Sequence, residues 1–141
     1  MNSLPRAQET LYFQNAAGKV FHHASGYARL AWSAERPTLD HIKAFYEQVL
    51  ALLLNTNARK ILSDHGQRAP LPAAAQEWLT TNWIPRAMSQ ARTRHCAIVE
   101  GADPLHRLST QSVVSASPNG FLFQRFSTVE AAETWLKSVV V

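Results

Sequence analysis

The sequence has a single cysteine, Cys96, and no run of about 18 apolar residues of the kind that crosses a bilayer. A lone cysteine excludes a disulfide within the chain, and this indicates a reducing compartment. The first residues lack the apolar middle that a signal peptide needs. We therefore expect a cytoplasmic protein with no transmembrane segment.

Charged residues are also scarce, at 17% of the 141 residues, whereas hydrophobic residues make up 46%. This composition is typical of one compact globular domain and excludes a disordered or fibrous chain. We expect a single domain over residues 1–141, in which residues 1–9 form a flexible tail.

The chain is basic, with 14 Lys and Arg against 10 Asp and Glu and a net charge of +4. Its densest basic group, Arg86, Arg92 and Arg94, lacks the glycine and aromatic residues of a base-stacking strand. Scattered arginines on a solvated surface are one interpretation, and a basic stripe for phosphate or anionic lipid is the other. Neither predicts a specific nucleic-acid partner.

The amino-terminal quarter predicts three neighbouring antiparallel strands. Leu11, Tyr12 and Phe13 have strand character, and residues 19–24 and 27–32 follow after turns too short for a crossover. The pattern then changes to helical spacing after Thr38, a predicted N-cap. The apolar stripe of this helix comprises Ile42, Phe45, Tyr46, Val49, Leu50 and Leu53.

Strands and helices alternate in the rest of the chain. Strands are predicted at residues 60–64, 95–100 and 121–126, and the intervening helices predict that they are parallel. The helix that begins at Pro72 should kink or restart at Pro85, since proline removes a helical hydrogen bond.

Two more helices complete the prediction. Asp103 should cap the first of them, with Leu105, Leu108 and Val113 on its inward face. Ser127 and Glu130 have the spacing of a capping box for the closing helix. Its predicted buried side comprises Val129, Ala132, Trp135, Leu136 and Val139. With Trp135 in the core, Trp135→Ala should cost about 3 to 5 kcal/mol.

This order of elements resembles the SpoIIAA-like or STAS family, whose name joins sulphate transporters and anti-sigma-factor antagonists. The resemblance to bacterial STAS-like proteins covers residues 10–138 and implies an α/β fold. In that fold an N-terminal antiparallel strand meander precedes βαβαβα, with a mixed central sheet and about four helices. It rests on residues 30–33 (LAWS) before Thr38 and Leu39, residues 60–64 (KILSD), 77–79 (EWL) and 83–87 (WIPRA), and Phe126, Glu130, Ala131, Trp135 and Leu136.

The resemblance also implies a function without catalysis. Antagonists of this family bind a partner kinase, and phosphorylation of a serine in the loop after a central strand breaks the partnership. The matching loop here, residues 64–72, contains no Ser or Thr, and the nearby Ser63 lies in the predicted strand. The expectation is therefore a signalling or protein-interaction module without the phosphoserine switch, with a homodimer as one possible assembly.

Polar residues gather where two predicted parallel strands end. Because the carboxyl ends of parallel strands share one edge of a sheet, we expect these residues to form a rim that binds a protein partner or a small anionic ligand. The alternatives are a loop that satisfies its own backbone, with His65 and Arg68 solvated, and acid-base catalysis by Asp64 and His65. The rim comprises Asp64, His65, Gln67, Arg68, Glu100 and Asp103.

A second functional hypothesis is a domain that binds a small ligand or lipid in a cavity open to solvent. The leucine-rich segment 49–54 and the pair Trp78 and Trp83, of which only one can face fully inward, favour it. No metal site is predicted, because His22 and His23 are strand neighbours and point to opposite faces. Cys96 is predicted to be a buried structural thiol, and we expect no cofactor and no enzymatic activity.

Overall fold

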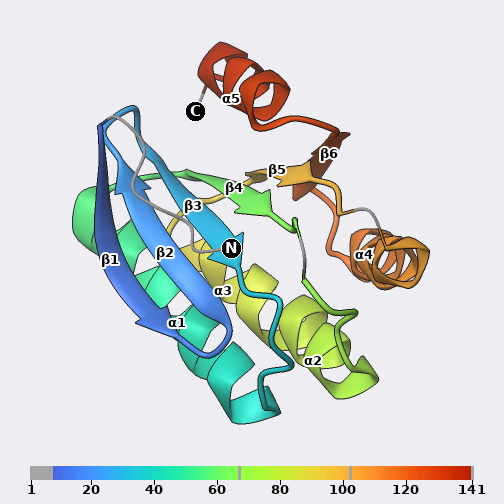
Figure 1. Cartoon of the computed structure of the whole chain (residues 1–141). Coiled ribbons are helices and arrows are strands. Elements are labelled where there is room, and N and C mark those ends of the chain that lie inside the picture. Colours follow the sequence, from blue (N-terminus) through green and yellow to red (C-terminus); the bar gives the residue numbers. More distant parts are fainter. Residues whose placement is uncertain (1–7, 67, 102, 141) are drawn as a thin grey trace.

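The computed structural model describes residues 8–66, 68–101 and 103–140, which form an α/β fold around a mixed sheet (Figure 1). The sheet has six strands in this part of the chain, arranged in the order β1-β2-β3-β4-β5-β6. The strands are β1 (Glu9–Asn15), β2 (Gly18–His23), β3 (Tyr27–Trp32), β4 (Lys60–Asp64), β5 (His95–Val99) and β6 (Leu122–Phe126).

The pairing directions confirm the predictions for both halves of the sheet. The strands β1, β2 and β3 pair antiparallel, and β3, β4, β5 and β6 pair parallel. The first strand begins two residues before Leu11. Glu9, which the sequence analysis assigns to a tail, is therefore part of the sheet and pairs with Arg29 at 2.8 Å. The rest of the expected tail up to residue 7 lies outside the described residues.

Helices lie on both faces of the sheet. One face is covered by α1 and by the continuous run of α2, the π-helical turn η1 and α3, whereas α5 covers the other face (Figure 1). The helix α4 lies beside α2 and η1. The bounds are α1 (Leu39–Thr56), α2 (Ala73–Trp78), η1 (Leu79–Trp83), α3 (Ile84–Gln90), α4 (Pro104–Ala116) and α5 (Val129–Ser138).

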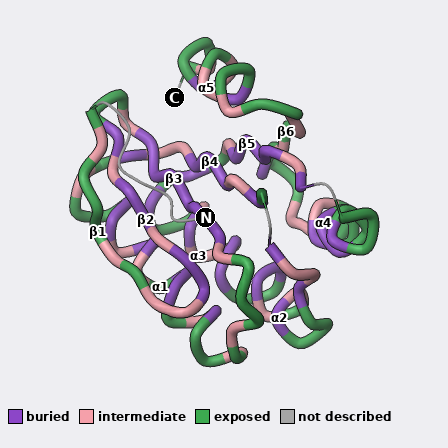
Figure 2. The backbone as a smooth tube through the Cα atoms, viewed as in Figure 1, coloured by how far each residue is buried: buried purple, intermediate pink, exposed green. Residues whose placement is uncertain are grey.

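The larger core lies between the sheet and α1, and β3 is buried along its whole length (Figure 2). Phe45 and Val49 are completely buried, as the helical spacing predicts. Trp83 is also buried and donates its indole N–H to the carbonyl of Tyr46 at 2.7 Å, whereas Trp78 is half-buried. The two tryptophans therefore do differ in burial, as expected.

The predicted cap of α1 is also confirmed. The Thr38 hydroxyl accepts a hydrogen bond from the backbone N–H of His41 at 3.1 Å. Asn57, with φ of 58°, ends the helix in the left-handed conformation that asparagine tolerates.

The helical run after Pro72 does not break at Pro85. The irregularity occurs one turn earlier, in η1, where the helix widens to the π form. Pro85 then occupies the first turn of α3, where a missing N–H costs least.

The inward face predicted for α4 is wrong at two positions. Leu105 and Leu108 are 66% and 65% exposed, and of the predicted face only Val113 is buried. The inward side of this helix is largely polar. It packs against η1 and against the segment between β4 and α2, where His106 contacts His65. Its buried residues are His106, Ser109, Thr110 and Val113.

The closing helix α5 also differs in detail from the prediction. Its N-cap is Thr128, not Ser127, and the Thr128 hydroxyl accepts from the backbone N–H of Ala131 at 3.1 Å. Ala132 and Leu136 are completely buried. Trp135, expected in the core, is half-buried, because its ring lies at the margin of the sheet against His95 and Phe126.

Candidate functional site

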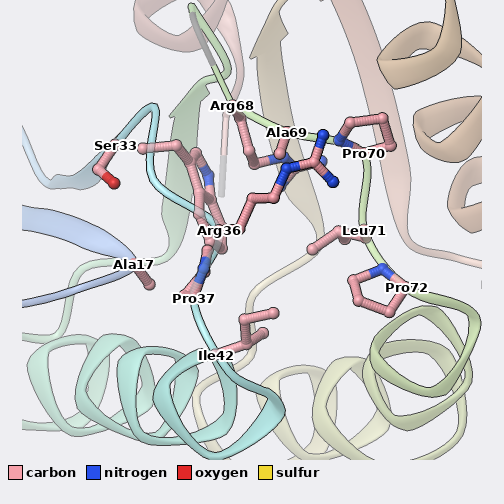
Figure 3. A pocket seen from close by; sticks show the side chains of 11 residues that line it. Ala17, Ser33, Arg36, Pro37, Ile42, Arg68, Ala69, Pro70, Leu71 and Pro72 are labelled. Carbon is pink, nitrogen blue, oxygen red and sulfur yellow. The ribbon is translucent and has the colours of Figure 1, made fainter.

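A pocket of about 80 Å³ lies at the carboxyl ends of β3 and β4 (Figure 3). One wall is the loop between β3 and α1, and the other is the loop between β4 and α2. This is the edge of the sheet where the sequence analysis expects a rim. The lining residues are Ala17, Trp32, Ser33, Arg36, Pro37, Ile42, Arg68, Ala69, Pro70, Leu71 and Pro72.

Arg68 is the charged residue buried in this pocket. It is only 6% exposed, and its guanidinium carbon lies 4.6 Å from the centre of the Trp32 ring. The Trp32 indole N–H donates to the hydroxyl of Ser63 at 2.9 Å, which fixes the ring beneath the guanidinium. Arg68 is therefore buried, and the alternative in which it is simply solvated is wrong.

No carboxylate in the described residues lies within ion-pair distance of Arg68. Its Nε atom is buried and has no hydrogen-bond partner among them. The hydroxyl of Tyr46 lies within hydrogen-bonding reach of the side chain. Burial lowers the pKa of Arg68, but a guanidinium stays protonated at neutral pH.

The groups around Arg68 do not compensate its charge. Burial raises the pKa of Tyr46 to about 12, although Arg68 opposes the shift. Burial also raises the pKa of Cys96 to about 12, so both groups are neutral at pH 7. Cys96 is thus the buried structural thiol that the sequence predicts.

A second arginine lies on the opposite wall. Arg36 is exposed and comes from the β3–α1 loop, and Figure 3 shows the side chains of Arg36 and Arg68 reaching into the space between the two loops. Ile42 and Leu71 supply apolar lining. No acidic residue is among the described lining residues, so the pocket combines positive charge with an apolar floor.

His65, predicted on the rim, points into the protein instead. It is 3% exposed, and its Nδ1 atom lies 2.8 Å from Nε2 of the completely buried His106. The hydroxyl of Thr110 is 3.4 Å from Nδ1 of His65 and 3.4 Å from Nε2 of His106. Burial, and then the charge of Arg68, holds the pKa of His65 well below its usual range and lowers that of His106 to about 4. Both rings are neutral at pH 7.

Three other predicted rim residues, Asp64, Glu100 and Asp103, do not line the pocket. Glu100 accepts hydrogen bonds from the guanidinium of Arg125. Asp103 caps α4, as predicted, by accepting from the backbone N–H of Leu105 at 2.9 Å. Asp64 is half-buried at the end of β4, and Gln67 lies outside the described residues.

The residues that complete the pocket were missed from the sequence. Neither Trp32 nor Arg36 is among the rim residues predicted from the sequence. One signal could have found Arg36: it follows β3, whose carboxyl end lies at the same edge of the sheet as that of β4. The leucine-rich segment 49–54, expected to help line a cavity, lies mostly in the core, with Leu52 and Leu53 at 0% and 1% exposure.

Comparison with family models, with curated proteins and with solved structures finds no match for this chain. Fold and pocket therefore define the molecule only as an α/β protein with a mixed sheet and a positively charged pocket at the carboxyl ends of its strands. Among the helices of the described residues, none combines the length and the apolar character needed to span a bilayer. The same residues hold no cluster of three or more His, Cys, Asp or Glu side chains suited to a metal ion.

Proposed function

We propose that the protein is a non-catalytic binding domain whose pocket holds an anionic group, a carboxylate or a phosphate, on Arg68. The observation that carries the proposal is a buried arginine with no carboxylate partner and an unsatisfied Nε, facing a pocket. A buried charge is costly unless it is paired, so an arginine in this setting is suited to an anion from outside the chain.

The size of the pocket limits what enters it. A volume of about 80 Å³ accommodates several water molecules or one carboxylate or phosphate group, but not a large organic ligand. Anions form charge-assisted hydrogen bonds with arginine, each worth roughly 1.5 to 3 kcal/mol. The apolar residues Ile42 and Leu71 would exclude water from the contact.

The resemblance to STAS-like domains supports binding in place of catalysis. The described elements follow the expected order, an antiparallel meander and then alternating helices and parallel strands. The loop that corresponds to the family's regulatory loop forms one wall of the pocket and has no hydroxyl residue to phosphorylate. Ser63 is buried and accepts a hydrogen bond from Trp32, which supports a module without the phosphoserine switch.

The anionic group has two possible sources, a small molecule or an acidic side chain of a protein partner. Native mass spectrometry of the protein purified from its own host distinguishes them. We expect wild type to retain an acidic small molecule or an acidic partner, and Arg68→Gln to retain neither. Lys137→Gln, which removes an exposed positive charge on α5, serves as the matched control and should behave as wild type. Equal retention by wild type and Arg68→Gln would contradict the proposal.

A further inference from the structure

A second positively charged hollow lies at the opposite end of the parallel strands. Arg59 directly precedes β4 and Arg94 directly precedes β5, so both stand at amino ends of strands, whereas the Arg68 pocket stands at carboxyl ends. With Arg92 they line a groove of about 510 Å³, which we call the basic groove. Two of these arginines belong to the densest basic group of the sequence.

The three arginines of the basic groove have no ionic partner. No ion pair or side-chain hydrogen bond within the described residues involves Arg59, Arg92 or Arg94. By contrast, Arg86 of the same sequence group pairs with Glu47 at 2.8 Å. No acidic residue is among the described residues that line the groove. Three positive charges therefore share one concave surface, and no carboxylate of the described residues pairs with them.

The end of α3 places Arg92 at the groove. Its φ is 56°, in the left-handed region that favours glycine or asparagine. The N–H groups of Ala91 and Thr93 both bond to the carbonyl of Ala87 at 3.1 Å, so Arg92 is the left-handed residue that ends the helix. Glycine suits this backbone, so the side chain of residue 92 can be removed without straining the helix end.

The shape of the basic groove favours a small ligand. Its volume lies within the range of roughly 300 to 1,000 Å³ that is usual for small-molecule sites. Met88 contributes apolar surface beside Arg94, and Ser89 and His95 contribute polar surface. The groove is open to solvent, and its three arginines gather in one place, which fits a compact polyanion better than an extended nucleic acid backbone that needs charges spread along a stripe.

We propose that the basic groove binds a small molecule that carries two or more phosphate groups. Arginine matches phosphate with paired N–H donors, and three arginines in one hollow offer enough donors for several phosphate oxygens. The basic groove shares no lining residue with the Arg68 pocket. This proposal is therefore independent of the function proposed above.

Isothermal titration calorimetry with inorganic pyrophosphate tests the proposal. The titration uses Arg68→Met, which removes the buried charge of the other pocket, as the parent protein. We expect saturable binding to this parent, tighter than that of inorganic phosphate, and a loss of about tenfold or more in affinity when Arg94→Gln or Arg92→Gly is added. Glycine suits the left-handed backbone of residue 92, so Arg92→Gly should fold as well as its parent and its loss cannot reflect unfolding. Lys43→Gln, which removes a positive charge on α1 outside both pockets, should leave pyrophosphate binding unchanged.

Three outcomes would overturn the proposal. One is the absence of saturable pyrophosphate binding. Another is unchanged affinity in both groove variants. The third is clearly tighter binding to a DNA duplex or to phosphatidylserine vesicles, if Arg92→Gly and Arg94→Gln abolish it, because the groove would then serve a macromolecule or a membrane surface.

Discussion

At the residue scale, the buried histidine pair couples the β4–α2 segment to α4. His65 and His106 share a hydrogen bond of 2.8 Å, which needs one ring to donate and the other to accept. Both rings are buried, and Arg68 opposes a further positive charge on either. The neutral pair therefore holds the segment that carries Arg68 against α4.

This pair predicts loss of stability in mild acid. The folded-state pKa of both histidines is below the ordinary 6.5, and that of His106 is about 4. Below pH 6.5 the histidines are therefore protonated in the unfolded chain but stay neutral in the folded chain. The free energy of unfolding that the neutral pair provides is complete above pH 6.5 and is lost as the pH falls toward 4. Each histidine should contribute about 1.4 kcal/mol per pH unit within that window. Urea denaturation of wild type and His106→Gln at pH 7 and pH 5 measures this, and an equal pH dependence in the two proteins would contradict it.

The sequence could predict the edge of the sheet at which the pocket lies, but not its members. Asp64 ends the predicted strand β4 and His65 and Arg68 come soon after it, so the edge at which they lie was predictable. Arg68 and His65 turn inward because of partners that are distant in the sequence. Arg68 packs on Trp32, and His65 bonds to His106. No local sequence pattern indicates these contacts. Glu100 instead binds Arg125, 25 residues further along the chain, and Asp103 caps α4.

At the scale of elements, predictions succeeded where one face of an element is uniformly apolar. The stripe of α1 has that property, and so does the face of β5 that carries Cys96 and Ile98; their predicted and observed positions agree. The helix α4 lacks it, because its buried side includes His106 and Thr110 while Leu105 faces solvent. Apolar spacing alone therefore selected the wrong face.

The closing helix α5 provides a test of burial at this scale. Leu136 is completely buried between α5 and the sheet, whereas Trp135 is only half-buried. Leu136→Ala should lower the free energy of unfolding by about 2 to 5 kcal/mol, and Trp135→Ala by about 1 to 2 kcal/mol, less than a core tryptophan would cost. Urea denaturation of both variants measures the difference, and a larger loss for Trp135→Ala would show that its ring belongs to the core.

At the scale of the whole molecule, the parallel strands separate two positive surfaces. The Arg68 pocket lies at their carboxyl ends, and the basic groove lies at their amino ends. Within the described residues, arginines that form no ion pair therefore lie at both ends of the parallel strands. Alternation of strands and helices produces this arrangement, since successive crossovers keep all carboxyl ends on one side.

The central claim is that Arg68 binds an anion in its pocket. One measurement tests this claim most directly. The thermal midpoint of wild type and Arg68→Met is compared in chloride and in acetate, phosphate or citrate at equal ionic strength. Methionine preserves much of the packing on Trp32 without the charge, so Arg68→Met should be at least as stable as wild type in chloride. We predict that at least one of these anions raises the midpoint of wild type and leaves that of Arg68→Met unchanged. An equal shift in the two proteins, or no shift in wild type with any of the three anions, would contradict the account.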